Sequence, residues 1–272
     1  MTLLAPSGPG AALLGHGRGD VVEVLPWESA AFSGLLAGGV EDERTATRLR
    51  AHDVAIVYSR APLLADNLRP LIASVVSHDP APPPGGPHAA RWFASCLPAI
   101  GVAAPPHLDT PTLQPSEDEH RAASALVATL PPSFLAVHPG SGSPAKNWPA
   151  ERFARLAHAA APRKWLLVRG PADAVAAEAL EELPGACVAR DFPLRVLAAV
   201  LARAGAYVGN DSGISHLAAA CGAPTVAIFG PTDPALWAPV GRRVEIVRRP
   251  TMDAIPVDAV ASALGRAMAA PR

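Results

Sequence analysis

Short apolar runs alternate along this chain with longer alanine-rich stretches, a pattern typical of strands buried on both faces of a parallel sheet and separated by helices. In the first half, strands are expected at residues 3–5, 21–25, 54–58 and 72–77. In the second half, strands are expected at residues 134–137, 164–168, 206–208, 225–229 and 244–247. Helices are expected at residues 120–130, 150–161, 172–183, 194–204 and 212–220. Strand and helix in this order predict an α/β fold.

Two polar, proline-rich stretches interrupt the pattern, at residues 79–86 and 105–119. The second is the better boundary, because it precedes a predicted helix and the Pro131-Pro132 break that ends it. We therefore expect two Rossmann-like halves with parallel sheets, residues 1–128 and residues 129–272, facing each other across a cleft. No internal repeat of fixed period is present.

Composition narrows the class of protein. The 272 residues are 50% hydrophobic and carry 23 basic and 24 acidic side chains, so the net charge of -1 gives no field that would gather nucleic acid, and no nucleic-acid partner is expected. Cys96, Cys187 and Cys221 lie far apart without a CxxC pair, which excludes a disulfide framework and a zinc knuckle. No signal peptide and no apolar run near the ~20 residues of a spanning helix are found, so a cytoplasmic protein is expected.

The first candidate for chemistry is HPGSGSPAKNWP, residues 138–149, where a predicted strand runs through a Gly/Ser-rich loop into a helix. Glycines let a ligand approach the backbone, and the N–H groups and dipole at a helix start favour negative charge. Lys146 adds a full positive charge. The motif therefore indicates an anion site, although a plain strand-to-helix turn with a solvated lysine explains it equally well.

The second candidate is GNDSGISH, residues 209–216, which also follows a predicted strand. Asp211 is expected to be the N-cap of the helix, so that the N–H groups of Ser212 and Gly213 point to the carboxyl edge of the sheet. His216 lies on the same helical face as Ser212 and is placed to reach a bound phosphate, the alternative being a buried structural histidine. The loop FGPTDP, residues 229–234, is expected beside the same edge.

A hydrolase triad of Asp211, Ser212 and His216 is not supported. The aspartate and serine are adjacent in sequence, and no GxSxG elbow surrounds the serine. The residues at this edge are therefore interpreted as a binding site for an anionic group.

Together, HPGSGSPAKNWP followed by ERFARLA, and VGNDSGISHLAAACGAPTVAIFGPTDPALWAPVG, resemble the nucleotide-sugar-binding half of glycosyltransferase family 9, the ADP-heptose:lipopolysaccharide heptosyltransferases. The resemblance covers residues 134–262. It implies a GT-B fold and an inverting, metal-independent transfer of heptose or a similar sugar from an ADP-sugar to a lipid-linked saccharide of the lipopolysaccharide core or a related glycan. It implies no cofactor and no metal ligands. The protein would be cytoplasmic, with peripheral contact at the inner face of the cytoplasmic membrane.

The resemblance also implies roles for individual residues. Ser141 and Lys146 resemble the residues of the family's phosphate-contacting loop, and Asp211 resembles the carboxylate near the sugar. Ser212, Gly213 and His216 would hold the diphosphate. Asp173, in the GPAD loop, is a candidate for the nucleoside end. Donors and positive charge aimed at the diphosphate would stabilise the charge that develops as the glycosidic bond breaks.

The general base for the acceptor hydroxyl is less clear. Family members carry it as the Asp of a GDxxxxLP motif, and Gly19-Asp20 followed by Leu25-Pro26 matches those letters, which makes Asp20 a catalytic candidate. The surrounding sequence favours another register, in which residues 1–28 correspond to the family's second strand, the next helix and a third strand. In that register the first half lacks its first strand and the true base motif.

Two functions follow from these alternatives. The chain is either an active family 9 glycosyltransferase or a homologue that binds a nucleotide sugar but is catalytically incomplete. A more distant alternative, a GT-B sugar-nucleotide epimerase, needs catalytic carboxylates that the sequence does not identify.

Overall fold

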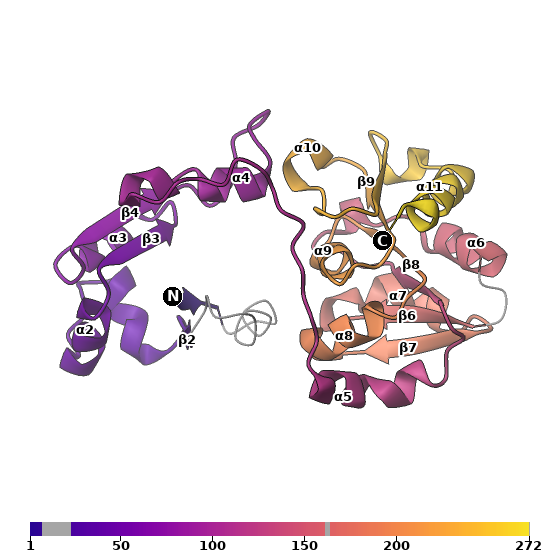
Figure 1. Cartoon of the computed structure of the whole chain (residues 1–272), viewed down its shortest axis with the longest axis horizontal. Helices are drawn as coiled ribbons and strands as arrows, with labels where there is room; N and C mark the ends of the chain where they lie inside the picture. The colour runs from indigo at the N-terminus through magenta and orange to yellow at the C-terminus, as the bar shows by residue number, and fades with distance from the viewer. Residues whose placement is uncertain (7–22, 161–163, 272) are drawn as a thin grey trace. The chain divides into compact units, whose positions relative to one another are not determined.

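The computed structural model describes residues 1–6, 23–160 and 164–271, and it confirms an α/β fold built on parallel sheets (Figure 1). The chain divides into two compact units, Met1–Leu108 and Asp109–Arg272. Each unit has its own buried apolar cluster. The candidate residues from Ser141 to His216 all belong to the second unit.

The first unit contains two parallel strand pairs. β1 (Thr2–Ala5) pairs with β2 (Glu23–Pro26), and β3 (Val54–Tyr58) pairs with β4 (Ser74–His78). The helical elements are η1 (Ala30–Leu36), α2 (Glu43–Arg50), α3 (Pro62–Leu68), α4 (Ala89–Ala94) and η2 (Leu97–Ile100), where η marks a 3-10 helix. The core of the unit is formed by Leu25, Phe32, Leu35, Leu49, Val57, Ala65, Leu68 and Ile72.

The strand expected at residues 21–25 is present as β2 (Glu23–Pro26), which pairs in parallel with β1. Asp20 itself lies outside the described residues.

A six-stranded parallel sheet forms the centre of the second unit, in the order β10-β9-β8-β5-β6-β7. The strands are β5 (Leu135–His138), β6 (Trp165–Arg169), β7 (Ala186–Arg190), β8 (Ala206–Asn210), β9 (Thr225–Phe229) and β10 (Val244–Arg248). β7 was not expected. It is an edge strand whose side chains are mostly half-buried, and its apolar run ACVA is short enough to be read as part of a helix or a strand.

Helices cover both faces of this sheet. α6 (Ala150–Ala160), α7 (Ala174–Glu181) and α11 (Val257–Ala269) pack on one face, where Phe153, Leu180 and Val260 join the main core. α8 (Leu194–Leu201) and α9 (Gly213–Ala220) pack together on the other side, with α5 (Glu117–Val127) against α8 (Figure 1). Short elements η3 (Pro144–Lys146), η4 (Pro171–Asp173), α10 (Pro234–Trp237) and η5 (Met252–Ala254) lie in the loops.

The division between the units falls before α5, whereas the sequence placed it near residue 128. The cause is the packing of α5 on α8, which includes an ion pair between Glu119 and the nine-tenths buried side chain of Arg195. The N–H of Leu113 also donates to the carbonyl of Ala220 at 2.9 Å. These contacts join the segment from Asp109 onward to the second unit.

The order of the strands makes β5 and β8 neighbours in the middle of the sheet. From β5 the chain proceeds outward through β6 and β7, and it then returns to the other side of β5 as β8. Between β5 and β8 the strand order reverses, and ligands of open α/β sheets bind outside the carboxyl ends of the strands at such a point. Both candidate motifs begin where these two strands end.

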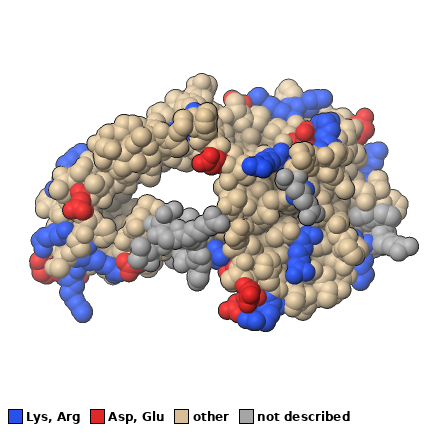
Figure 2. All heavy atoms as spheres, viewed as in Figure 1, with Lys and Arg blue, Asp and Glu red and all other residues tan. Residues whose placement is uncertain are grey.

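Charged side chains are sparse on the face of the molecule in Figure 2, where most of the surface belongs to other residue types, in keeping with a sequence that is only 17% charged. All three cysteines are free thiols, as expected, and burial raises the pKa of Cys221 to about 12. Among the helices that the structure describes, none has the length and apolar character needed to cross a bilayer.

Candidate active site at the ends of β5 and β8

The side chain of Asn210 fixes the loop between β5 and α6. Asn210 is fully buried at the end of β8; its Oδ1 accepts from the N–H of Trp148 at 3.1 Å, and its Nδ2 donates to the carbonyl of Pro139 at 2.7 Å. Trp148 is anchored further, because its indole N–H donates to the carbonyl of Ile255 at 2.9 Å. One amide group therefore holds both ends of the loop against β8.

Lys146 joins the two motifs. Its Nζ lies 3.1 Å from Oδ2 of Asp211, a residue 65 positions later in the chain, and the hydroxyl of Thr232 donates to the same oxygen at 2.9 Å. Asp211 is buried, while the Lys146 side chain stays 23% exposed. Thr232 belongs to the FGPTDP loop, so three separate segments meet at one carboxylate.

Asp211 does not cap α9, and the expectation that it would is wrong. The N-cap is Ser212, with φ −155° and ψ 161°, and its side chain makes no capping hydrogen bond. The Asp211 carboxylate turns instead to Lys146 and Thr232. The local signal of an aspartate before a helix was overridden by a tertiary ion pair that no short-range rule contains.

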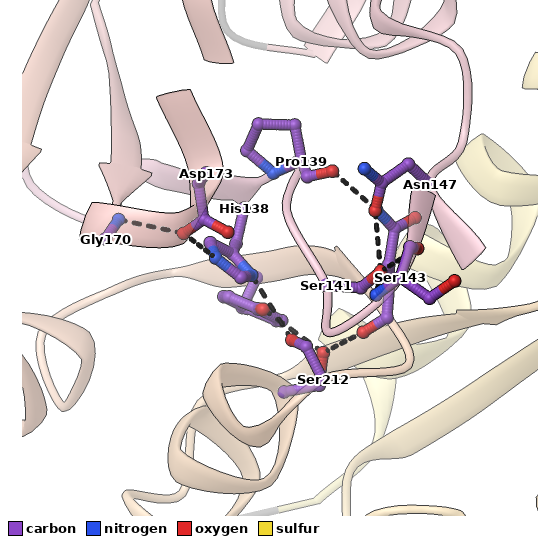
Figure 3. A network of polar contacts seen from close by, with 11 residues as sticks. His138, Pro139, Ser141, Ser143, Asn147, Gly170, Asp173 and Ser212 are labelled. Atoms are coloured by element: carbon purple, nitrogen blue, oxygen red, sulfur yellow. Dashed lines mark hydrogen bonds and ion pairs between the residues drawn. The ribbon is translucent and has the colours of Figure 1, made fainter. Parts of the chain in front are cut away.

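His138, the last residue of β5, was not selected from the sequence and proves to be central. Figure 3 shows it between Asp173 and Ser212: Nε2 lies 2.9 Å from Oδ2 of Asp173, and Nδ1 lies 3.2 Å from Oγ of Ser212. His138 and Asp173 are both buried. The sequence signal that could have identified His138 is its place at the end of a central strand, directly before the glycine-rich loop.

The Asp173 carboxyl is held ionised. Burial alone would raise its pKa, but the hydrogen bonds from His138 and from the Gly170 N–H, with the charge of Arg169 nearby, keep the pKa below its usual value. An ionised carboxylate at Nε2 requires a proton on that nitrogen. Neutral His138 therefore presents a bare Nδ1 that accepts from the Ser212 hydroxyl.

The loop closes over this pair. A Cβ on Gly140 would collide with the Asp173 carboxylate, so only glycine lets the backbone pass this close. Asp173, expected at the nucleoside end, is committed through Oδ2 to His138 and Gly170. Its contacts are those of a residue that positions His138.

At two other positions, neither packing nor backbone conformation requires a glycine. A Cβ on Gly142 or on Gly213 would meet nothing within 4 Å, and neither glycine has a positive φ. Gly142 lies in the loop after β5, and Gly213 is the first residue of α9. Both glycines lie at the same sheet edge and have open space beside their Cα atoms. A ligand therefore has room to approach the backbone at these two positions.

The remaining candidates lie at the same edge. The Ser141 hydroxyl lies 2.7 Å from the carbonyl of Ser143 and 2.6 Å from Oδ1 of Asn147, so it orders the loop and can donate to only one acceptor at a time. His216 is exposed on the first turn of α9, which overturns its alternative interpretation as a buried structural histidine. Within the described ranges, no three His, Cys, Asp or Glu side chains are grouped to hold a metal ion.

Comparison with known proteins identifies the type of fold. The model of glycosyltransferase family 9 (heptosyltransferase) matches residues 64–263. Lipooligosaccharide heptosyltransferase 2 of Haemophilus ducreyi is 30% identical over 177 residues, which are 58% of this chain and 51% of that protein. The chain thus spans about half the length of this curated relative, and its match to the Haemophilus influenzae protein of the same name spans 33% of that protein.

Solved structures share the architecture. A glycosyl transferase family 9 structure from Veillonella parvula superposes with a TM-score of 0.79 at 20% identity and covers 98% of this chain and 88% of its own. The Escherichia coli heptosyltransferase WaaC with ADP superposes with a TM-score of 0.66 at 20% identity, covering 97% of this chain and 89% of its own. These similarities show that the chain has the GT-B type of fold.

Proposed function

The chain belongs to glycosyltransferase family 9, and we propose that it transfers heptose, or a similar sugar, from an ADP-sugar to a lipopolysaccharide-core or related glycan acceptor. The observation that carries the proposal is the ion pair of Lys146 with Asp211, which brings the glycine-rich loop and the start of α9 to one place at the carboxyl edge of the sheet. A nucleotide-binding edge with a partly exposed cation is what a diphosphate leaving group requires.

The diphosphate is proposed to lie between the loop and α9. Gly142 and Gly213 leave their backbone open there, and the first N–H groups of α9 have no intrahelical acceptor and carry the positive end of the helix dipole. Lys146 adds the full charge, Ser212 and His216 supply further donors, and Ser141 orders the loop beside the diphosphate. The E. coli structure that shares this fold holds ADP, which supports a nucleoside diphosphate as the ligand.

The proposed chemistry is an inverting displacement. The acceptor hydroxyl attacks the anomeric carbon from the face opposite to the diphosphate, the glycosidic bond to the phosphate oxygen breaks, and ADP leaves with the bonding electrons. Lys146 and the α9 amides offset the charge that develops on the leaving group, so the proposal requires no metal ion. Asp211 lies beside Lys146 and is assigned to the sugar end of the donor.

The acceptor side of the proposal rests on the family. A lipid-linked saccharide would reach the protein at the inner face of the cytoplasmic membrane, where the chain makes peripheral contact. Asp20 stays the candidate general base that takes the proton of the acceptor hydroxyl. If that base is not functional here, the chain binds the donor without transferring its sugar.

Calorimetric titration with ADP and with ADP-heptose, beside a transfer assay on a heptose-deficient core acceptor with and without a metal chelator, tests the proposal. Binding with chelator-resistant transfer is the expected result. Binding without transfer would identify a catalytically incomplete homologue that only binds nucleotide sugars. Absence of binding to either nucleotide would overturn the assignment of the site.

A further inference from the structure

Two hydrogen bonds connect Asp173 to His138 and His138 to Ser212. They lead from a buried carboxylate to the start of α9, where the diphosphate is proposed to bind. Ser212 is the N-cap of α9, and its hydroxyl is not used to cap the helix. The Ser212 hydroxyl forms a hydrogen bond with Nδ1 of His138 at 3.2 Å. Where the single hydroxyl proton of Ser212 points therefore depends on whether that nitrogen carries a proton.

In the neutral state of His138 the hydroxyl is turned away from the ligand. The Asp173 carboxylate holds the imidazole proton on Nε2, at 2.9 Å, so Nδ1 offers a lone pair and Ser212 donates to it. The oxygen that Ser212 then presents to the site carries only lone pairs. A diphosphate oxygen next to it meets an acceptor and is repelled.

In the protonated state the direction reverses. The Nδ1–H group donates to Ser212 Oγ, and the serine proton becomes free to point at an anionic oxygen. The resulting imidazolium is paired with a carboxylate whose pKa is already held low by its hydrogen bonds. The buried pair is thus arranged to stabilise a positive charge one residue behind the anion site.

We propose that protonation of His138 turns the Ser212 hydroxyl toward the bound diphosphate, so that binding of a nucleoside diphosphate takes up a proton at His138. This inference rests on the proposed function. His138 acts through Ser212 and does not contact the ligand, so it is a positioning residue. Binding and protonation are then reciprocally coupled: each increases the other by the same factor.

Several other titratable or charged groups lie around His138 and Ser212. Asp173 from η4 and Arg169 from β6 lie on the Nε2 side, while the Lys146–Asp211 pair and His216 lie at the same sheet edge as Ser212. From β8, the buried Tyr207 phenol bonds Ser215 and Ser212, and burial raises its pKa, so it stays neutral. His138 bonds both Ser212 and the Asp173 carboxylate, so its protonation state is linked directly to the direction of the Ser212 hydroxyl.

The experiment measures ADP affinity between about pH 5.5 and 8, the range in which histidines titrate. ADP itself takes up a proton in this range, so each variant is compared with the wild type at the same pH, which cancels the contribution of the ligand. The wild-type affinity should rise toward low pH by up to about tenfold per pH unit beyond that shared slope. Ser212→Ala and His138→Phe should lose this excess.

Three further variants separate the possible causes. Asp173→Asn keeps an oxygen for Nε2–H but removes the counter-charge, so its excess slope should appear at lower pH. Lys146→Ala should bind more weakly at every pH with the wild-type slope. His158→Gln removes an exposed imidazole on α6 and should match the wild type throughout.

The outcomes decide both proposals separately. If the wild type binds ADP but Ser212→Ala shows the same pH slope, the coupling is overturned and the proposed function stands. If the wild type binds no ADP at any pH, the proposed function fails and the coupling falls with it. Nitrogen-15 NMR of the unliganded wild type provides a check free of variant stability: a neutral His138 protonated on Nδ1 would overturn the proposal.

Discussion

The side-chain oxygen of Asn210 accepts from the backbone N–H of Trp148, across 62 positions of sequence, while the amide nitrogen of the same side chain donates to Pro139. Asn210 is fully buried, so no water replaces these bonds when they are lost. Replacement by alanine leaves two buried backbone groups unpaired, each of which costs about 1–3 kcal/mol.

We therefore expect Asn210→Ala to lower the free energy of unfolding of the second unit by several times the effect of Asn147→Ala. Asn147 accepts one hydrogen bond from Ser141 and is only half-buried, so its loss should cost about 1 kcal/mol. Urea unfolding of both variants measures the difference. Equal losses would show that the loop is not held by Asn210.

The two lysines of the chain provide a matched test of the anion site. Lys146 follows β5 at the carboxyl edge of the sheet, whereas Lys164 precedes β6 at the opposite edge and donates to the Thr129 carbonyl at 3.0 Å. Lys146→Ala removes the cation proposed to contact the diphosphate, so ADP affinity should fall by about tenfold or more. Lys164→Ala should leave the affinity unchanged in the same titration.

Three glycines of the site should respond in opposite ways to alanine. Gly140→Ala places a Cβ against the Asp173 carboxylate and should destabilise the fold, with a lower melting temperature. Gly142→Ala and Gly213→Ala place a methyl group in open space, so their melting temperatures should be unchanged or slightly higher. If a diphosphate lies there, both should nevertheless bind ADP more weakly.

Retained affinity in stable Gly142→Ala and Gly213→Ala variants would contradict the placement of the diphosphate between the loop and α9. These two variants are informative because they are expected to change ADP affinity without lowering the melting temperature. Loss of affinity with an unchanged melting temperature reports on the ligand alone.

The ion pair between Glu119 and Arg195 should make the second unit sensitive to acid. Burial would raise the pKa of Glu119, but the hydrogen bonds from Arg195 and from the Ser116 N–H lower it below the usual 4.5. Because the folded-state pKa is depressed, the stabilisation is complete above about 4.5 and is lost as the pH falls through the lowered value.

Glu119→Gln keeps the side-chain shape and an oxygen for the capping box of α5, but removes the charge. It should lower the free energy of unfolding by about 1.5–3 kcal/mol at neutral pH and make the decline toward acid shallower. Asp118→Asn on the same helix removes an exposed partner of Arg121 and should cost less than about 0.5 kcal/mol. Chemical unfolding at several pH values compares the two.

The sequence was sufficient for those features that depend on local pattern. The central strands β5, β8 and β9 are continuous apolar runs, so their positions and their parallel arrangement could be predicted. The two candidate motifs could be placed at one sheet edge because both follow such strands. The edge strand β7 was missed, because a short apolar run such as ACVA does not distinguish a strand from the alanine-rich helices of this chain.

Contacts between distant segments could not be predicted in the same way. Asp211 satisfies the local rule for a helix cap, but its actual partners are Lys146 and Thr232, and Ser212 takes the cap position. His138 could have been noticed at the end of a central strand, but its role depends on Asp173 and Ser212, 35 and 74 positions away. Such pairs are set by the topology of the sheet and not by spacing along the chain.

Because α5 packs on α8, the second unit can be separated from the chain at one place but not at another. A recombinant fragment that begins at residue 109 retains Glu119 opposite Arg195 and the bond from Leu113 to Ala220. A fragment that begins at residue 129 would uncover the side of α8 that α5 protects and would separate Arg195 from Glu119. The smallest fragment expected to keep the proposed ADP site therefore includes the helix that the sequence assigned to the first unit.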